Sequence, residues 1–273
     1  MKHHPGVPQA GIGGQADIDP QVGGVGSQSG GASWRGDYHL HSSFSPDSNN
    51  TPEQIVERAI AHRLDCIAVT DHNTIAGALE VQRQAPFRVI VGCEVTSRDG
   101  HILGLFLHEN LMPGRDAQST VAQIHAQGGI AIAPHPFSRL CGRSLGRALE
   151  QNPHLFDAVE VFNSNSFITA DNRRALEFAR RHGIRAITGS DAHRPRGIGR
   201  NIVTMPPFGA PAQFLAALDH AHFDARYHTL PYFAAMALVD LTWRWRMRWD
   251  PEFDLKIPPP APPLRSPLSA DEC

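Results

Sequence analysis

Two histidines separated by one residue, His39 and His41, end a short alternation of apolar and polar residues. Side chains two positions apart leave a β-strand on the same face, so we expect these two imidazoles to point to one place. Asp47 follows in a predicted turn and adds a carboxylate. Imidazole nitrogens and carboxylate oxygens are ligands of Zn²⁺, Mn²⁺ and Fe²⁺. The segment therefore predicts half of a metal site.

Further candidate ligands stand at the ends of segments that we expect to be strands. The predicted strands are short apolar runs at 64–69, 87–93, 100–106, 129–133, 158–162 and 185–189. The polar residues that follow or begin these runs are His72, Glu94, His101, His135, Asn163, Asp191 and His193. Folds built on parallel strands place their chemistry at the C-terminal ends of the strands. We therefore expect these side chains to meet at one rim.

Helix patterns alternate with these strands. Thr51 and Pro52 begin one helix with an N-cap and a proline in the first turn, and a second follows Asn73 and Thr74. Further helices are predicted at 117–126, 170–181 and 212–221. The alternation predicts an α/β fold with a parallel sheet, and six or seven such strands fit a distorted barrel better than two separate sheets.

The composition is that of a soluble globular protein. The chain has 273 residues, of which 41% are hydrophobic and 19% charged, so one main domain is expected. A net charge of −2 gives no broad basic surface for nucleic acid or membrane. The four cysteines show no CxxC spacing, which favours a reducing, cytoplasmic location without disulfides. No secretory signal is recognised, and no apolar run reaches the roughly 18 residues of a transmembrane helix.

We expect four regions along the chain. Residues 1–34 are predicted to be a disordered Gly/Pro-rich tail, 35–225 the main domain, 226–257 a C-terminal helical extension and 258–273 a Pro-rich disordered tail. Residues 232–249 are apolar and then rich in Trp and Arg. One interpretation is a packing helix with a solvated end, and the other is a surface helix that contacts a membrane or a protein partner.

The candidate ligands occur in a characteristic order of motifs. The motifs are HLH at 39–41, Asp47, TDH at 70–72, Glu94, His101, APHPF at 133–137 and GSDAH at 189–193. In this order, from about Asp37 to Val203, the chain resembles the PHP superfamily (polymerase and histidinol phosphatase). The resemblance implies a distorted (β/α)7 barrel between the two tails, a cluster of two or three divalent metal ions (Zn, Mn or Fe) and phosphoesterase activity.

Carried over to this chain, the resemblance implies three metal positions. The first would be held by His39, His41, Glu94 and Asp191. The second would be held by Glu94, His101 and His135, with Glu94 bridging, and the third by Asp47, His72 and His193. We expect Glu94, Asp191 and His193 to be catalytic, with His193 a candidate acid for the leaving group. Two adjacent ions would supply a bridging hydroxide as nucleophile and neutralise charge on phosphoryl oxygens.

Other polar residues are weaker candidates. We expect Arg139, Arg196 and Asn163 to bind substrate, because they follow strand-end motifs and guanidinium groups suit phosphate. Asp71 would either orient His72 or stand as an acid at a helix start. Glu160 alternates with two valines and would either face the barrel interior or cap its strand.

Three functions compete. The leading hypothesis is hydrolysis of a small phosphate ester or nucleotide. The second is an exonuclease that trims oligonucleotides, which would need a basic groove with stacking aromatics, so that a nucleic-acid substrate is not favoured. The third is a metal-stabilised binding module without catalysis.

Overall fold

The computed structural model describes residues 32–140 and 143–235, and in them nine strands form one sheet in the order β7-β6-β5-β4-β3-β2-β1-β8-β9. The strands are β1 (Trp34–Leu40), β2 (Cys66–Val69), β3 (Arg88–Thr96), β4 (His101–Leu105), β5 (Ile130–Ala133), β6 (Ala158–Asn163), β7 (Arg185–Gly189), β8 (Asn201–Met205) and β9 (His222–Ala225). β2, β5 and β6 are buried along their whole length, because one face of each strand points into the curled sheet and helices cover the other face.

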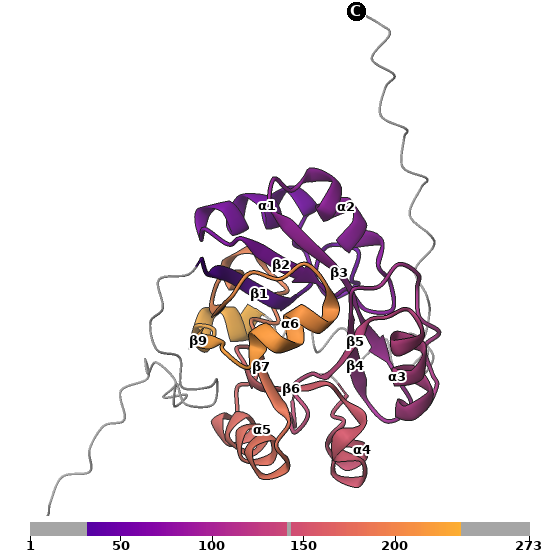
Figure 1. Ribbon diagram of the computed structural model, residues 1–273. Helices are drawn as coiled ribbons and strands as arrows, with labels where there is room; N and C mark the ends of the chain where they lie inside the picture. Colours follow the sequence, from indigo (N-terminus) through magenta and orange to yellow (C-terminus); the bar gives the residue numbers. More distant parts are fainter. Residues whose placement is uncertain (1–31, 141–142, 236–273) are drawn as a thin grey trace, which may run out of the picture.

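The sheet curls into a nearly closed barrel (Figure 1). β8 pairs with the first residues of β1, Trp34 to Gly36, and leaves the second half of β1 without that neighbour. The residues after β7 fill this place: the Asp191 amide donates to the His39 carbonyl at 2.8 Å, and the His41 amide donates to the Ala192 carbonyl at 3.1 Å. The end of β1 and the end of β7 are therefore joined at one rim.

Helices lie outside this sheet (Figure 1). They are α1 (Pro52–Ala61), α2 (Ala76–Gln84), α3 (Ala117–Ala126), α4 (Gly146–Gln151), α5 (Thr169–His182) and α6 (Pro211–Leu218), with 3-10 turns η2 (Pro153–Leu155) and η3 (Pro195–Gly197). α1 begins with a capping box between Thr51 and Gln54. α5 ends at Gly183, whose φ of 62° is the left-handed conformation that glycine adopts without strain.

This architecture confirms the expected distorted α/β barrel and differs from a fully parallel sheet at β4 and at β8, which runs antiparallel to β1 and β9. β4 runs antiparallel to both β3 and β5. The turn at 97–100, which joins β3 to β4, is too short for the crossover that parallel neighbours require. α4, β8 and β9 were not expected from the sequence. α3 coincides with the predicted 117–126, and α5 covers 169–182 where 170–181 was predicted.

Several expectations fall partly or wholly outside the described residues. β1 begins at Trp34, the last residue of the predicted 1–34 tail, of which 1–31 are not described. The segment 232–249 is described only to residue 235, in a helix that begins at 230. Cys66 and Cys93 are buried free thiols, and a cytoplasmic location stays a prediction. Within the described part of the chain, no helix combines the length and apolarity needed to cross a membrane.

Candidate metal centre

Nine histidine and carboxylate side chains converge at the rim where β1 and β7 meet. They are His39, His41, Asp47, His72, Glu94, His101, His135, Asp191 and His193, and Asp47 is the most exposed, with 15% of its side chain accessible. His101 begins β4, and the antiparallel direction of that strand places its start at the C-terminal end of β3, opposite Thr96. The reversal of β4 thus delivers a strand-initial histidine to the same rim as the strand-final ligands.

Four side chains form a first group around one point. The Nε2 atoms of His39 and His41 lie 3.3 Å apart. His41 Nε2 lies 3.2 Å from Glu94 Oε2 and 3.3 Å from Asp191 Oδ1, and His39 Nε2 lies 3.4 Å and 3.5 Å from the same two atoms. These are the four residues that the resemblance assigns to the first metal.

Glu94 extends the cluster through its second oxygen. Oε1 lies 3.0 Å from His135 Nε2 and 3.1 Å from His101 Nδ1. His72 Nδ1 approaches the other oxygen, Oε2, at 3.7 Å, and His72, Glu94 and His101 form a group with metal-compatible spacing. His72 therefore lies between the second and third sets implied by the resemblance, instead of in the third alone.

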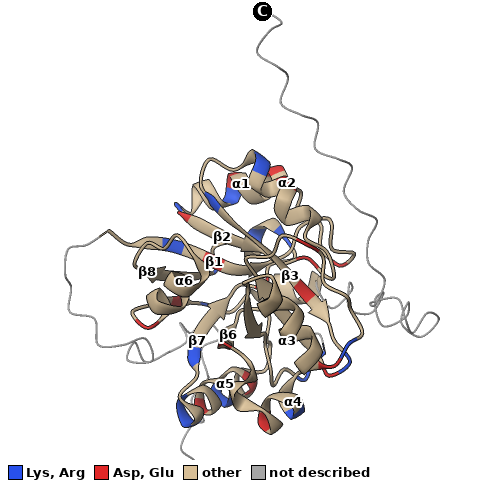
Figure 2. Ribbon diagram, turned by 45° about the vertical axis from the view of Figure 1, so that its right-hand side comes forward, with Lys and Arg blue, Asp and Glu red and all other residues tan. Residues whose placement is uncertain are grey.

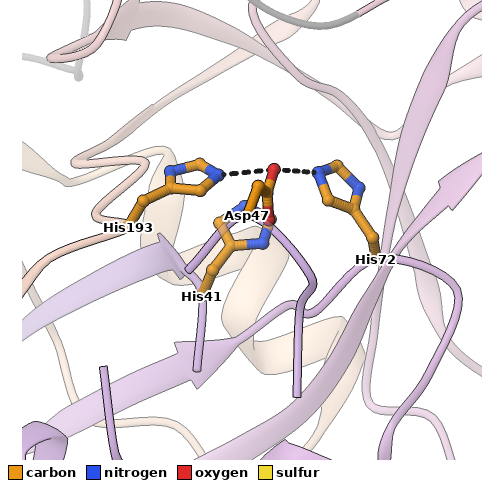
Figure 3. Close-up of side chains that lie close together, drawn as sticks. All are labelled: His41, Asp47, His72 and His193. Carbon is orange, nitrogen blue, oxygen red and sulfur yellow. Dashed lines mark hydrogen bonds and ion pairs between the residues drawn. The ribbon is translucent and has the colours of Figure 1, made fainter. Parts of the chain in front are cut away.

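The third group surrounds Asp47 (Figure 3). Asp47 Oδ2 lies 3.2 Å from Nε2 of both His72 and His193. His41 completes this group, so it is shared with the first one. The rings of His41 and His193 stack with centroids 4.2 Å apart. The three groups are thus continuous, joined through Glu94, His41 and His72.

The backbone at two of these positions is strained. His135 has φ of 28° and Asp191 has φ of 51°, values that residues with a Cβ rarely adopt. Each such conformation costs on the order of 1–3 kcal/mol and persists where surrounding structure enforces it. Each is the second residue after its strand, where the unusual turn directs the side chain toward the cluster.

The donor atoms fit a divalent cation. His39 Nδ1 donates to Glu160 Oε1 at 2.9 Å, which leaves the lone pair of Nε2 directed at the first group. Asp191 Oδ1 is buried and has no hydrogen-bond partner in the described part of the chain. Lone pairs of His39 Nε2 and Asp191 Oδ1 therefore face one another across 3.5 Å, and a cation between these two atoms would remove the repulsion.

Without a cation, protons would balance this charge. Burial opposes the charged form, but the Asp47 and Glu94 carboxylates raise the pKa of His72 to about 9. Burial likewise opposes protonation of His193, yet Asp47 and Asp191 raise its pKa to about 10. The carboxylates respond in the opposite sense: against the effect of burial, His193 and His72 hold the pKa of Asp47 well below its ordinary value. The cluster thus attracts positive charge strongly.

Two further carboxylates hold this cluster in place. Glu160 accepts hydrogen bonds from His39 and, through Oε2, from the His135 amide at 2.7 Å. It therefore faces the barrel interior, which is one of the two alternatives that the sequence left open. Asp71 accepts from the amide and the hydroxyl of Ser42, both at 2.6 Å, and so fixes the loop after β1. The alternation of Glu160 with valine was the sequence signal for its inward direction.

The three residues expected to bind substrate lie in different surroundings. Asn163 is fully buried, and its amide donates to Glu160 Oε2 at 2.9 Å and to Asp191 Oδ2 at 3.2 Å. The Arg139 side chain is 62% exposed, and its Nε pairs with Asp171 at 2.9 Å. Arg196 is exposed in η3 and lines a cavity outside the nine-residue cluster. Of the three, only Asn163 contacts a member of the cluster.

Models of known protein families match the region of the chain that contains the cluster. The PHP domain model matches residues 37–194, and a PHP-associated model matches residues 169–222. An uncharacterised protein of Methanocaldococcus jannaschii is 35% identical over 143 residues, which is 48% of this chain and 82% of that protein. A phosphoribosyl 1,2-cyclic phosphate 1,2-diphosphodiesterase of Eggerthella lenta is 37% identical over 82 residues, 27% of this chain and 31% of that protein.

Solved structures share the fold at low sequence identity. PsfC from Pseudomonas syringae superimposes with a TM-score of 0.55 at 16% identity, over 79% of this chain and 99% of that one. The lesion-specific endonuclease PfuEndoQ from Pyrococcus furiosus gives 0.54 at 18% identity, over 70% of this chain and 58% of that one. At these low identities, the two superpositions show a shared fold and nothing further.

Proposed function

This chain belongs to the PHP domain family, and from this we propose that it is a metal-dependent phosphoesterase that hydrolyses a small phosphate ester or a nucleotide. The observation that carries the proposal is the continuity of the three ligand groups through Glu94, His41 and His72. Adjacent cation positions that share a carboxylate are an arrangement that catalyses phosphoryl transfer to water.

We assign the first metal position to His39, His41, Glu94 and Asp191, and further positions to the groups around Glu94 Oε1 and Asp47. Zn²⁺, Mn²⁺ and Fe²⁺ all suit this mixture of nitrogen and oxygen donors. When bound, such ions supply Lewis acidity, which lowers the pKa of water and neutralises charge on phosphoryl oxygens.

Other roles in the proposed reaction fall to the chain's own residues, which orient the metal ligands and protonate the leaving group. Glu160 fixes the tautomer of His39, and Asn163 holds the Asp191 carboxylate. Asp47, His72 and His193 are the most accessible side chains of the cluster, at 15%, 9% and 7%, so we assign substrate entry to this edge. His193 is our candidate for donating a proton to the leaving oxygen when the third group holds no ion, because Asp47 keeps its imidazole protonated.

An exposed aromatic ring favours a nucleotide among the small esters. Phe167 is 54% exposed on the loop that follows β6, and Asn165 of the same loop lies 3.5 Å from Asp191 Oδ2. An accessible ring beside a phosphate site can stack on a nucleobase. Sequence reasoning missed Phe167, because its exposure depends on the path of this loop.

An endonuclease-type activity on nucleic acid is the second candidate. Its support is the fold shared with PfuEndoQ, a lesion-specific endonuclease of which this chain covers 58%. We place it second because stacking along a strand uses successive accessible rings, and Phe167 is the only exposed Phe, Tyr or Trp among the described residues.

The test is hydrolysis by metal-loaded protein of mononucleotides, dinucleotides, an aryl phosphate and a short single-stranded oligonucleotide. We expect mononucleotide or aryl phosphate turnover to exceed oligonucleotide cleavage. Glu94→Gln should reduce turnover at least roughly a hundredfold, because it removes the shared ligand. Glu109→Gln, at an exposed position, is the matched control. Inert metal-replete protein, or full turnover by Glu94→Gln, would contradict the proposal and leave the non-catalytic binding module.

A further inference from the structure

A cavity of about 990 Å³ lies behind the metal centre. α1, the start of β1, the η3 turn, β8, β9 and the helix beginning at 230 contribute to its wall. Arg194 has extended backbone, with φ of −140° and ψ of 150°, so its side chain leaves the chain opposite to that of His193. His193 faces the metal centre, and Arg194 lines this cavity. The cavity volume falls within the range of roughly 300–1,000 Å³ typical of small-molecule sites.

The charge of the lining is almost entirely positive. The arginines that line the cavity are Arg35, Arg58, Arg194, Arg196, Arg200 and Arg226, and the acid is Asp224. Arg226 pairs with Asp224 at 3.2 Å, so these two charges cancel. The other five guanidinium groups form no ion pair with any residue that the structure describes. Figure 2 shows basic positions on α1 and near β8, the elements beside this cavity.

Neutral acceptors orient part of this arginine cluster. Arg58 Nε donates to the Pro195 carbonyl at 3.1 Å, and its Nη2 donates to His62 Nε2 at 2.9 Å. Arg35 Nη2 donates to the His62 carbonyl at 3.4 Å. These bonds orient the guanidinium groups without cancelling their positive charge, because a carbonyl or a neutral imidazole carries no net charge. Burial and the charges of Arg58, Arg35 and Arg200 hold the pKa of His62 below its ordinary value, which keeps it neutral.

One donor of the lining lacks an acceptor. The Nε atom of Arg194 is buried and has no hydrogen-bond partner among the described residues. Buried donors of this kind nearly always have a partner, and those without one call for an explanation. An anion in the cavity would supply the acceptor and the missing negative charge together.

We propose that this cavity binds a small phosphorylated molecule with at least two adjacent negative charges, at a site separate from the metal centre. Guanidinium groups pair with phosphate oxygens through parallel hydrogen bonds, and several converging guanidiniums match a diphosphate better than a single carboxylate. This inference does not depend on the proposed hydrolytic activity.

The form of the lining favours a compact ligand over a nucleic-acid strand. Its tyrosine, Tyr232, is 7% exposed and stacks on His228, itself 5% exposed, with centroids 3.8 Å apart. Neither ring is accessible for stacking on bases. The net charge of the whole chain is −2, which gives little long-range attraction for a nucleic-acid strand.

The test is calorimetric titration of inorganic pyrophosphate into the full chain carrying Glu94→Gln, stripped of metal and dialysed free of chelator. This background removes phosphate binding through metal ions. We expect one pyrophosphate per chain, with inorganic phosphate weaker. Arg196→Ala together with Arg200→Ala should weaken binding about tenfold or more, because two charged contacts are lost. Arg173→Ala together with Arg181→Ala removes the same charge from the exposed side of α5 and should leave binding unchanged.

Because Arg200 is partly buried, Arg196→Glu alone provides a second variant at an exposed position, and it should also weaken binding. Absence of binding to the metal-free protein, or equal loss in both double variants, would overturn the proposal. Binding of a single-stranded oligonucleotide that depends on Arg196, without pyrophosphate binding, would also overturn it and assign the cavity to nucleic acid. Inactivity in hydrolysis assays would affect the proposed function alone.

Discussion

His39 Nδ1 lies 2.9 Å from Glu160 Oε1, and both side chains are 1% exposed. An ionised carboxylate only accepts hydrogen bonds, so this contact places the imidazole proton on Nδ1 and leaves Nε2 to bind a cation. The other oxygen of Glu160 accepts from the His135 amide at 2.7 Å and from Asn163 Nδ2 at 2.9 Å. One carboxylate thus orients a candidate ligand and the backbone that presents another.

Glu160→Gln should therefore weaken metal binding. A glutamine offers one acceptor oxygen where glutamate offers two, so either the His39 ring or the His135 amide loses its partner. Loss of an outer hydrogen bond to a metal-binding histidine typically costs 10–100-fold in affinity, and we expect a fall of about that size. Competition with a chromophoric chelator measures it.

Glu150→Gln is the matched control, since within 32–140 and 143–235 the Glu150 side chain makes only an exposed ion pair with Arg174 in α5. The metal affinity of Glu150→Gln should equal that of the wild-type chain. Unchanged affinity in Glu160→Gln would show that packing alone holds His39 in place.

Metal binding should also stabilise the fold. Shared histidines bring together the buried carboxylates Glu94, Asp191 and Glu160 and the partly exposed Asp47. A ligand that binds only the native state at a hundred times its Kd adds about 2.7 kcal/mol to the free energy of unfolding. We expect Mn²⁺ or Zn²⁺ to raise the urea midpoint of the metal-free protein, and Glu94→Gln to lose most of this increase. An equal increase in Glu94→Gln would indicate binding elsewhere.

The barrel and its rim could be predicted from sequence because strands and ligands are both local patterns. The apolar runs that end at Glu94, at His135 and at Asp191 mark strand termini without knowledge of their neighbours. The reversal of β4 was not predicted, although the short connection between the predicted strands 87–93 and 100–106 leaves no room for a parallel crossover. The assignment of His41 and His72 to two groups each depends on side-chain positions to within about an ångström, which the spacing of residues in the sequence does not give.

The arginine-lined cavity lay beyond sequence reasoning for a different reason. Its residues come from segments as distant as Arg35 and Arg226, and each of them resembles an ordinary surface arginine when read alone. Arg196 was singled out as a substrate contact at the metal centre, whereas the structure places it in this cavity.

Stability below neutral pH should depend on His228. Burial lowers the pKa of His228 to about 3, and its Nε2 donates to the Ser190 carbonyl at 2.8 Å. The unfolded chain takes up this proton near its ordinary pKa of about 6.5, whereas the native state does not. The native state therefore loses stability as pH falls from about 6.5 toward 3, by at most about 1.4 kcal/mol per pH unit from this group.

His228→Gln keeps a donor for the Ser190 carbonyl and removes the titration. We expect urea denaturation between pH 7 and pH 4.5 to show a smaller loss of stability in this variant than in the wild-type chain. His220→Gln, at an exposed position, should leave the pH dependence unchanged. Parallel pH profiles for wild type and His228→Gln would contradict a depressed pKa.

Gly199 shows how closely η3 packs on α1. Its φ is 76°, and a Cβ added there would lie 2.4 Å from Cγ of His62. Gly128 has a similar φ of 72° with nothing within 4 Å of an added Cβ. Gly128→Ala should therefore cost only the left-handed strain of about 1–2 kcal/mol. Gly199→Ala adds the displacement of the His62 ring, and overpacking of this kind typically costs a further 1–3 kcal/mol or so. Urea denaturation of both variants measures the difference, and equal losses would show that the two segments separate without cost.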